Sequence, residues 1–258
     1  MHAYALERQT LTQLATHADR SIRWVRDNLY AVPPISVSVT PQPTVIIADT
    51  TFWGRSFGVT VFRSPSLKKN LWWEAVESER VVTYRKGRRI LEAQGWNITA
   101  AVVDGRRGLA QVFHDIPVQI CIFHQMKRVT RYLTRRPQTP AGQALRSVML
   151  QIPHTTEQAF TTLLAQWYDQ WKDFISERTT LIGTDRWFYT HKSVRGAYYS
   201  MKRNLPYLFT HEHEPDLHIP TTTNSLDGMF TQLKNKLAVH RGLHGARRYR
   251  IISEILSK

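Results

Sequence analysis

This sequence has little of what secreted and membrane proteins need. Cys121 is the only cysteine in 258 residues, so no internal disulfide can form and the redox compartment is unconstrained. No apolar run is long enough to span a bilayer, and the N-terminus has no basic segment followed by an apolar one. We therefore expect a cytoplasmic protein that makes no contact with a membrane.

Acidic residues are also scarce relative to basic ones. Twenty Asp and Glu stand against 35 Lys and Arg, which gives a formal net charge of +15. Such an excess favours a polyanionic partner, with nucleic acid first and an anionic membrane surface second. There is no internal repeat or low-complexity tract, and the hydrophobic share of 42% is enough for a full core.

The first 31 residues have the pattern of two short helices around a tight turn. The first covers 10–15, and Ser21 can cap a second over 22–30, with Ile22, Val25 and Leu29 on one face. The outward basic residues are Arg20, Arg23 and Arg26. This segment is either a DNA-binding helix-turn-helix or a plain helical pair.

Residues 32–43 form a linker, because four prolines in twelve positions exclude a helix or a central strand. After it the sequence alternates between strand and helix patterns. We expect strands at 44–51, 57–63, 71–76, 98–103 and 118–123, and helices at 80–95 and 107–113. The pattern of residues 124–210 is helical throughout, 211–223 form a loop rich in His and acids, and helices follow at 226–240 and 245–257. This order predicts an α/β sheet flanked by helices.

Three aspartates stand where a metal-dependent nuclease needs carboxylates. Asp49 and Asp104 each end a buried apolar run, and Asp227 opens the helix at 226–240. Ligands bind beyond strand ends in open α/β sheets, and carboxylates on rigid elements can share metal ions that act on phosphate. A structural role is the alternative, because Asp104 precedes Gly105 in a turn pattern and an acid near a helix start is favoured by the helix dipole.

Several motifs together resemble one family. They are 47–54 (IADTTFWG), 103–109 (VDGRRGL), 121–125 (CIFHQ), 131–142, 223–228 (TNSLDG) and 233–243. In order and spacing they are similar to the mutator-like DDE transposases of bacterial insertion sequences, over about residues 10–250.

The resemblance implies a ribonuclease H-like domain at 44–258, with an all-helical insertion at about 137–210, behind the N-terminal helix-turn-helix of 1–31. It implies that Asp49, Asp104 and Asp227 bind two Mg²⁺ ions, for which Mn²⁺ can substitute. It also implies double-stranded DNA partners (transposon ends and target), a homo-oligomer on that DNA, and a place at the nucleoid. Structural roles near the site fall to Cys121, His124 and Asn224.

The family's third acid is typically Glu, whereas this chain has Asp227. Asp is one methylene shorter and Mg²⁺ is strict about geometry. We therefore expect Asp227→Glu to raise a reduced activity, unless the helix lies closer to the sheet, in which case the longer acid should crowd the ions.

Other candidates have open interpretations. The basic residues Lys127, Arg128 and Arg131 suit contacts with the DNA backbone or a merely solvated face. The Cys121–His124 pair is too small for a structural zinc site. The cluster at 211–216 is a metal-binding group or a solvated loop, and it is the best source of a replacement acid if Asp227 fails. The protein itself is a transposase, a catalytically dead DNA-binding regulator of its own element, or a ribonuclease H-like nuclease without strand transfer.

Overall fold

The computed structural model describes residues 1–7, 9–31, 39–240, 243 and 245–257. Most of the predicted linker (32–38) and part of the motif at 233–243 (241 and 242) lie outside these residues. The chain forms two compact units. The first joins Met1–Thr99 with Thr223–Lys258, and the second is Ala100–Thr222.

The predicted α/β class is confirmed by a mixed five-stranded sheet in the order β3-β2-β1-β4-β5. Its strands are β1 (Thr44–Phe52), β2 (Gly58–Ser64), β3 (Lys69–Val76), β4 (Ile98–Val103) and β5 (Val118–Ile120). The strand β2 pairs antiparallel with both β1 and β3, whereas β4 and β5 pair in parallel. This is the ribonuclease H-like arrangement that the resemblance implied.

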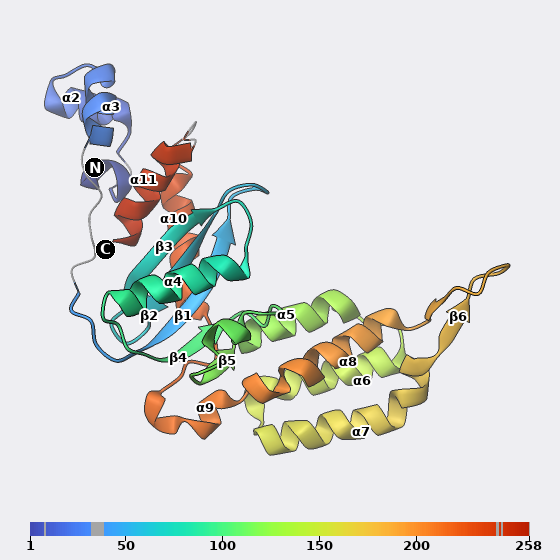
Figure 1. The fold of residues 1–258 in the computed structure, drawn as a ribbon. Helices are drawn as coiled ribbons and strands as arrows, with labels where there is room; N and C mark the ends of the chain where they lie inside the picture. Colours follow the sequence, from blue (N-terminus) through green and yellow to red (C-terminus); the bar gives the residue numbers. More distant parts are fainter. Residues whose placement is uncertain (8, 32–38, 241–242, 244, 258) are drawn as a thin grey trace. The chain divides into compact units, whose positions relative to one another are not determined.

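Helices cover both faces of the sheet in the first unit (Figure 1). On one face α4 (Val81–Ala93) packs on β2 and β3, where a Cβ at Gly87 would come within 2.6 Å of the Trp72 ring. On the other face α10 (Asn224–Leu237) packs on β1 and α11 (Gly245–Leu256) packs on β3. Side chains that alternate along β1 therefore face different helices.

The predicted N-terminal helix pair is present as α2 (Leu11–Ala18) and α3 (Ile22–Ala31), preceded by α1 (His2–Ala5). Ser21 caps α3 as expected, because its Oγ accepts a hydrogen bond from the Trp24 backbone N–H at 3.1 Å. The residues expected on the buried face of α3 differ in exposure: Val25 and Leu29 are buried, but Ile22 is 41% exposed. The three arginines Arg20, Arg23 and Arg26 are exposed, as predicted.

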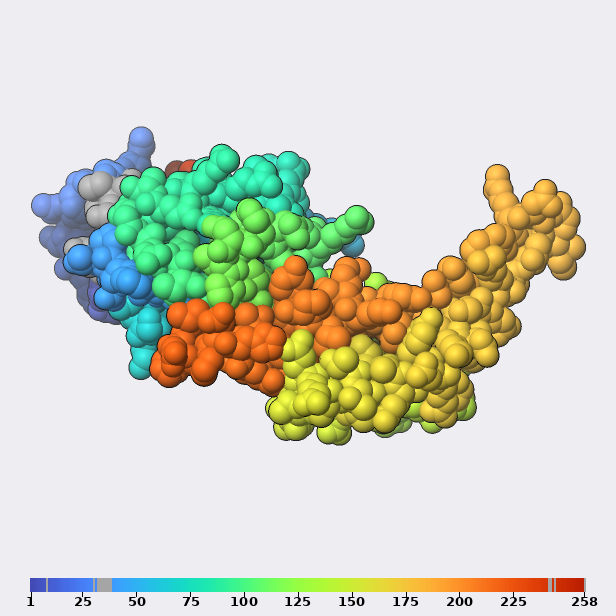
Figure 2. Space-filling view, turned by 60° about the horizontal axis from the view of Figure 1, so that its bottom comes forward, coloured from blue at the N-terminus to red at the C-terminus, as the bar shows by residue number. Residues whose placement is uncertain are grey.

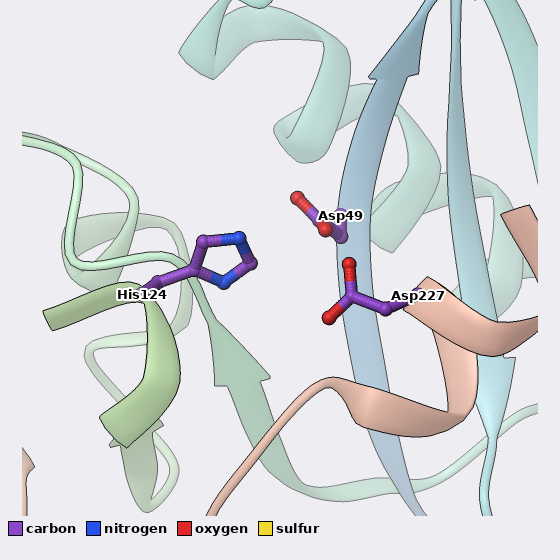
Figure 3. Close-up of side chains that lie close together, drawn as sticks. All are labelled: Asp49, His124 and Asp227. Atoms are coloured by element: carbon purple, nitrogen blue, oxygen red, sulfur yellow. The ribbon is translucent and has the colours of Figure 1, made fainter. Parts of the chain in front are cut away.

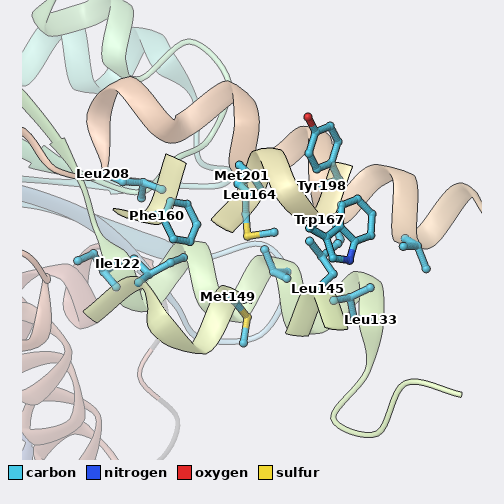
Figure 4. Close-up of a cluster of buried hydrophobic side chains, with 14 of the residues drawn as sticks. Ile122, Leu133, Leu145, Met149, Phe160, Leu164, Trp167, Tyr198, Met201 and Leu208 are labelled. Atoms are coloured by element: carbon cyan, nitrogen blue, oxygen red, sulfur yellow. The ribbon is translucent and has the colours of Figure 1, made fainter. Parts of the chain in front are cut away.

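The second unit is built on four helices around one apolar cluster (Figure 4). They are α5 (Ile122–Leu133), α6 (Pro140–Gln151), α7 (Glu157–Ser176) and α8 (Lys192–Asn204). Short turns of helix lie before, between and after them, at Ala110–Phe113, Ile152–His154, Leu205–Tyr207, Thr210–His213 (α9) and Pro215–Leu217. Trp167 anchors this core, because it is 3% exposed and its Nε1 donates to the Ala141 carbonyl at 3.0 Å.

Two details differ from the elements that the sequence predicted. A hairpin of β6 (Arg178–Thr180) and β7 (Trp187–Tyr189) interrupts the expected helical block and projects from the helices of its own unit (Figure 2). Threonines and aromatic residues favour strands, and Gly183 supplies a positive φ of 77° between them. In addition, β5 ends at Ile120, because the Cys121 carbonyl already accepts the first hydrogen bond of α5, from Gln125.

Among the described residues, no helix has the length and apolar character that crossing a bilayer requires.

Candidate active site

Asp49 lies in the buried part of β1 and is 7% exposed. Its neighbour Thr50 points to the α4 face, where its Oγ1 lies 3.0 Å from the hydroxyl of Tyr84. Because strand side chains alternate, Asp49 faces the opposite side, toward α10. Its Oδ1 also accepts a hydrogen bond from the Thr50 backbone N–H at 2.8 Å, which holds the carboxylate in one orientation.

Asp227 reaches the same place from the first turn of α10. Oxygens of the Asp49 and Asp227 carboxylates lie within 4.8 Å of one another, and the two side chains point toward each other (Figure 3). The neighbouring Leu226 and Phe230 are buried, so the apolar face of α10 fixes its rotation. The third side chain in that view, His124, belongs to the second unit.

The acid pair fits a divalent cation. Asp227 Oδ2 is buried and has no hydrogen-bond partner among the described residues. A buried carboxylate oxygen without a donor is costly, and a second carboxylate nearby adds repulsion. A hard cation coordinated by oxygen would relieve both costs, and carboxylates are the ligands that Mg²⁺ prefers.

A hydrogen-bonded network supports β1 from the other face. Thr50 Oγ1 lies 2.8 Å from Thr60 Oγ1 on β2, and the Tyr84 hydroxyl donates to Glu79 Oε1 at 2.8 Å. Burial raises the pKa of Tyr84 well above its usual value, and the negative charges of Glu79 and Asp49 raise it further. Tyr84 therefore stays a neutral donor, and the network ties the Asp49 strand to α4.

We expect Tyr84→Phe to lower the free energy of unfolding by about 1–2 kcal/mol, because Glu79 loses a buried donor and Thr50 a partner. Folding raises the Tyr84 pKa, so wild-type stability should fall as the pH rises above the unfolded value of about 10. The variant should show a shallower fall. Denaturant unfolding across this pH range measures both effects.

The matched control for this change is Tyr132→Phe, whose side chain is exposed on α5. It should change stability by less than about 0.5 kcal/mol. Equal stability of Tyr84→Phe and wild type would show that the hydroxyl network does not hold β1.

Asp104 follows β4 in the second unit and is clamped by Arg128. The Arg128 Nη2 lies 2.9 Å from Asp104 Oδ1, and its Nη1 donates to the Gly105 carbonyl at 2.6 Å. A Cβ at Gly105 would come within 2.6 Å of Asn204 Nδ2 and 3.0 Å of Ile120 Cγ2, so a larger residue would displace these side chains. Arg128, which we predicted to contact DNA, thus neutralises a predicted metal ligand in this structure.

The remaining predicted residues of α5 have different environments. Cys121 is a buried free thiol, and His124 is half-buried one turn into the helix. Lys127 and Arg131 are exposed. At the start of α10, Asn224 is exposed as well. The functional roles of these residues stay predictions.

The loop cluster at 211–216 is engaged elsewhere. His213 Nε2 lies 2.5 Å from Glu157 Oε2, and Glu212 accepts a hydrogen bond from the Glu157 backbone N–H. His211 contacts Gln119, and burial lowers the pKa of its imidazole. Glu212 and His213 thus tie the loop to the start of α7, and His211 ties it to β5.

Sequence reasoning missed one feature of the first unit. A hollow lies between the end of β1 and α10, with Trp53 and Lys234 among its lining residues. Its signal was available in the spacing, because Trp53 follows Asp49 by four residues and Lys234 follows Asp227 by two helical turns.

Comparisons with known proteins place few constraints on the chain. No protein-family model and no curated protein matches its sequence. Among solved structures, a chain of the Drosophila P element transposase strand transfer complex is similar, with a TM-score of 0.37 and 10% sequence identity. The match covers 92% of this chain and 85% of that one.

Proposed function

We propose that this protein is a DNA transposase of the DDE type, which cleaves DNA at transposon ends and joins the freed ends to a target. The observation that carries the proposal is the acid pair: Asp49 and Asp227 meet within 4.8 Å on a ribonuclease H-like sheet, and one buried oxygen lacks a donor. The net charge of +15 supports a nucleic-acid substrate.

Asp49 and Asp227 would hold the divalent cations, and Asp104 is proposed as the third acid. Bound Mg²⁺ or Mn²⁺ would supply activation of the attacking oxygen and stabilisation of charge at phosphorus. The chain itself orients the carboxylates, through the Thr50 N–H for Asp49 and through the first turn of α10 for Asp227. Arg128 neutralises Asp104 in this structure.

The basic surface would position the DNA. Exposed Arg20, Arg23 and Arg26 belong to the helix pair, and Lys127 and Arg131 extend along α5. Such side chains contact phosphates, and a helix pair of this kind can also read bases in a groove. We propose that the protein acts on both transposon ends as a homo-oligomer.

Replacing both Arg23 and Arg26 with Gln should lower affinity for terminal-repeat DNA roughly tenfold. The slope of log affinity against log salt concentration should decrease by the amount that about two phosphate contacts contribute. Both side chains are exposed, and Arg23 makes only a 3.9 Å ion pair with Asp27, so the fold should be retained. Fluorescence anisotropy at several salt concentrations measures the effect, with random-sequence duplex as the internal control. If the preference for the repeats is unchanged, we would assign sequence recognition to the second unit instead.

The experiment that tests the function uses a supercoiled plasmid carrying the inverted repeats that flank the gene. We expect nicking in Mg²⁺ that EDTA abolishes, followed by joining of cut ends to a target plasmid. Binding of the repeats without nicking would identify a dead regulator instead. Nicking without joining would identify a nuclease.

A further inference from the structure

A second candidate site lies in the first unit, beyond the acid pair. It is a hollow of about 450 Å³ lined by Phe52, Trp53, Lys234, Leu237, Ala238, His240, Leu243 and Arg248. Ligand sites commonly have volumes of several hundred cubic ångströms and a mainly apolar wall with a few polar groups. The volume suits one small planar molecule, such as a nucleotide, and excludes a duplex.

The wall combines aromatic faces with cations. Lys234 Nζ lies 5.8 Å from the centroid of the Trp53 ring. Arg248 also lines the hollow, and its guanidinium lies 5.1 Å from the ring of Phe57, which is not among the described lining residues. None of the described residues that line the hollow is acidic. An occupant with a flat, polarisable body and a negative group would match this wall on both counts.

Two residues that line the hollow each have a buried polar side-chain atom. Trp53 Nε1 and His240 Nε2 are both buried and without a hydrogen bond among the described residues. His240 is 8% exposed, and its ring centroid lies 4.1 Å from that of Tyr4 with the two planes tilted by 39°. Buried groups of this kind cost free energy unless something binds them, and base edges carry both donors and acceptors.

The position of the hollow follows from the two elements that carry the acid pair. Trp53 lies four residues after Asp49, one position beyond the end of β1, and four residues of extended chain span roughly 13 Å. Lys234 lies seven residues after Asp227 on the same face of α10, which is about 10 Å along a helix. Both displacements correspond to about three or four steps of a nucleic-acid strand at 3.4 Å per step.

We propose that this hollow binds one unstacked nucleotide of the DNA strand, with its base against Trp53 and its phosphate between Lys234 and Arg248. The nucleotide would lie a few steps from the phosphate held at the acid pair. This inference deepens the proposed function, since it names a second contact on the same substrate. It requires no metal, so it can be tested apart from cleavage.

The test compares blunt duplex DNA with the same duplex carrying an unpaired 2-aminopurine overhang, in EDTA. Wild type should bind the overhang more tightly and quench 2-aminopurine, because the base stacks on Trp53. Trp53→Leu should weaken binding of the overhang about tenfold, the usual size of a base–aromatic stack. It should leave binding of the blunt duplex unchanged, and Trp53→Phe should recover most of the affinity.

The matched control is Trp187→Leu, which removes a 46% exposed indole from the β6–β7 hairpin. It should leave overhang binding and quenching unchanged. Lys234→Gln, at an exposed position, provides a second test that does not disturb the core and should also weaken only the overhang. The proposal is wrong if Trp53→Leu and Lys234→Gln each weaken binding of blunt and overhang DNA equally, or if neither variant changes binding of the overhang. Overhang selectivity in a protein that never nicks DNA would keep this site and remove the transposase assignment.

Discussion

Asp49→Asn is expected to reduce Mg²⁺-dependent nicking by roughly three orders of magnitude or more, as for residues that act as one catalytic unit. The amide keeps the shape of the carboxylate, and its oxygen can still accept the Thr50 N–H bond. The negative charge that holds the cation is lost, while repulsion of the DNA backbone decreases. Binding of DNA should therefore be unchanged or slightly tighter.

Asp104→Asn should have the same effect on cleavage. It also weakens the clamp on Arg128, whose guanidinium now lies 2.9 Å from Asp104, and so leaves an extra cation for the DNA. Plasmid nicking and anisotropy binding measure the two properties side by side. Asp173→Asn, on the exposed side of α7, is the matched control and should behave as wild type. If either site variant folds but loses cleavage and binding together, a direct metal role is wrong.

Asp227→Glu is expected to lower nicking by ten- to a hundredfold, the size of effect that a displacement of about 1 Å can have. The sequence pattern alone favoured the opposite result, because the resembled family typically has Glu at this position. In the structure α10 already lies close enough for Asp227 to come within 4.8 Å of Asp49, and its Oδ2 is buried. An added methylene would push the carboxylate into space that the cations need.

The nicking assay with wild type, Asp227→Glu and Asp227→Asn separates the possibilities. Asp227→Asn should be inactive, and all three proteins should unfold at similar temperatures. If Glu raises nicking above wild type, the short acid is a lesion and the helix must lie farther from the sheet in the active protein. If all three proteins are inactive yet bind the repeats, the result favours the alternative of a catalytically dead DNA-binding regulator.

Local patterns predicted most elements of the sheet. The apolar runs before Asp49 and Asp104 are strands, and β4 covers the same residues that the pattern predicted. Ser21 caps α3 because a hydroxyl at that position satisfies a free backbone N–H within one turn. Such features depend on neighbours in sequence, so spacing and residue type are sufficient to find them.

Errors occurred where local preference was not decisive. The β6–β7 hairpin is too short for a clear strand period, and its aromatic residues suited a helical core equally well in the sequence. In the structure Trp187 is 46% exposed and packs under the Arg178 guanidinium at 3.9 Å, whereas Trp167 is in the core. Sequence spacing does not distinguish these two tryptophans, because burial is decided by which helices meet.

The sequence by itself determined the charge, the strand-end position of two acids, and the helix that carries the third. Only the tertiary structure decided that Asp227 meets Asp49, that Arg128 turns toward Asp104 rather than solvent, and that Trp53 and Lys234 line one hollow. Each of these contacts joins residues far apart in the chain. Their distances depend on how closely α10 packs on β1 and α5 beside the end of β4, and packing distance is set by the whole apolar interface rather than by any local pattern.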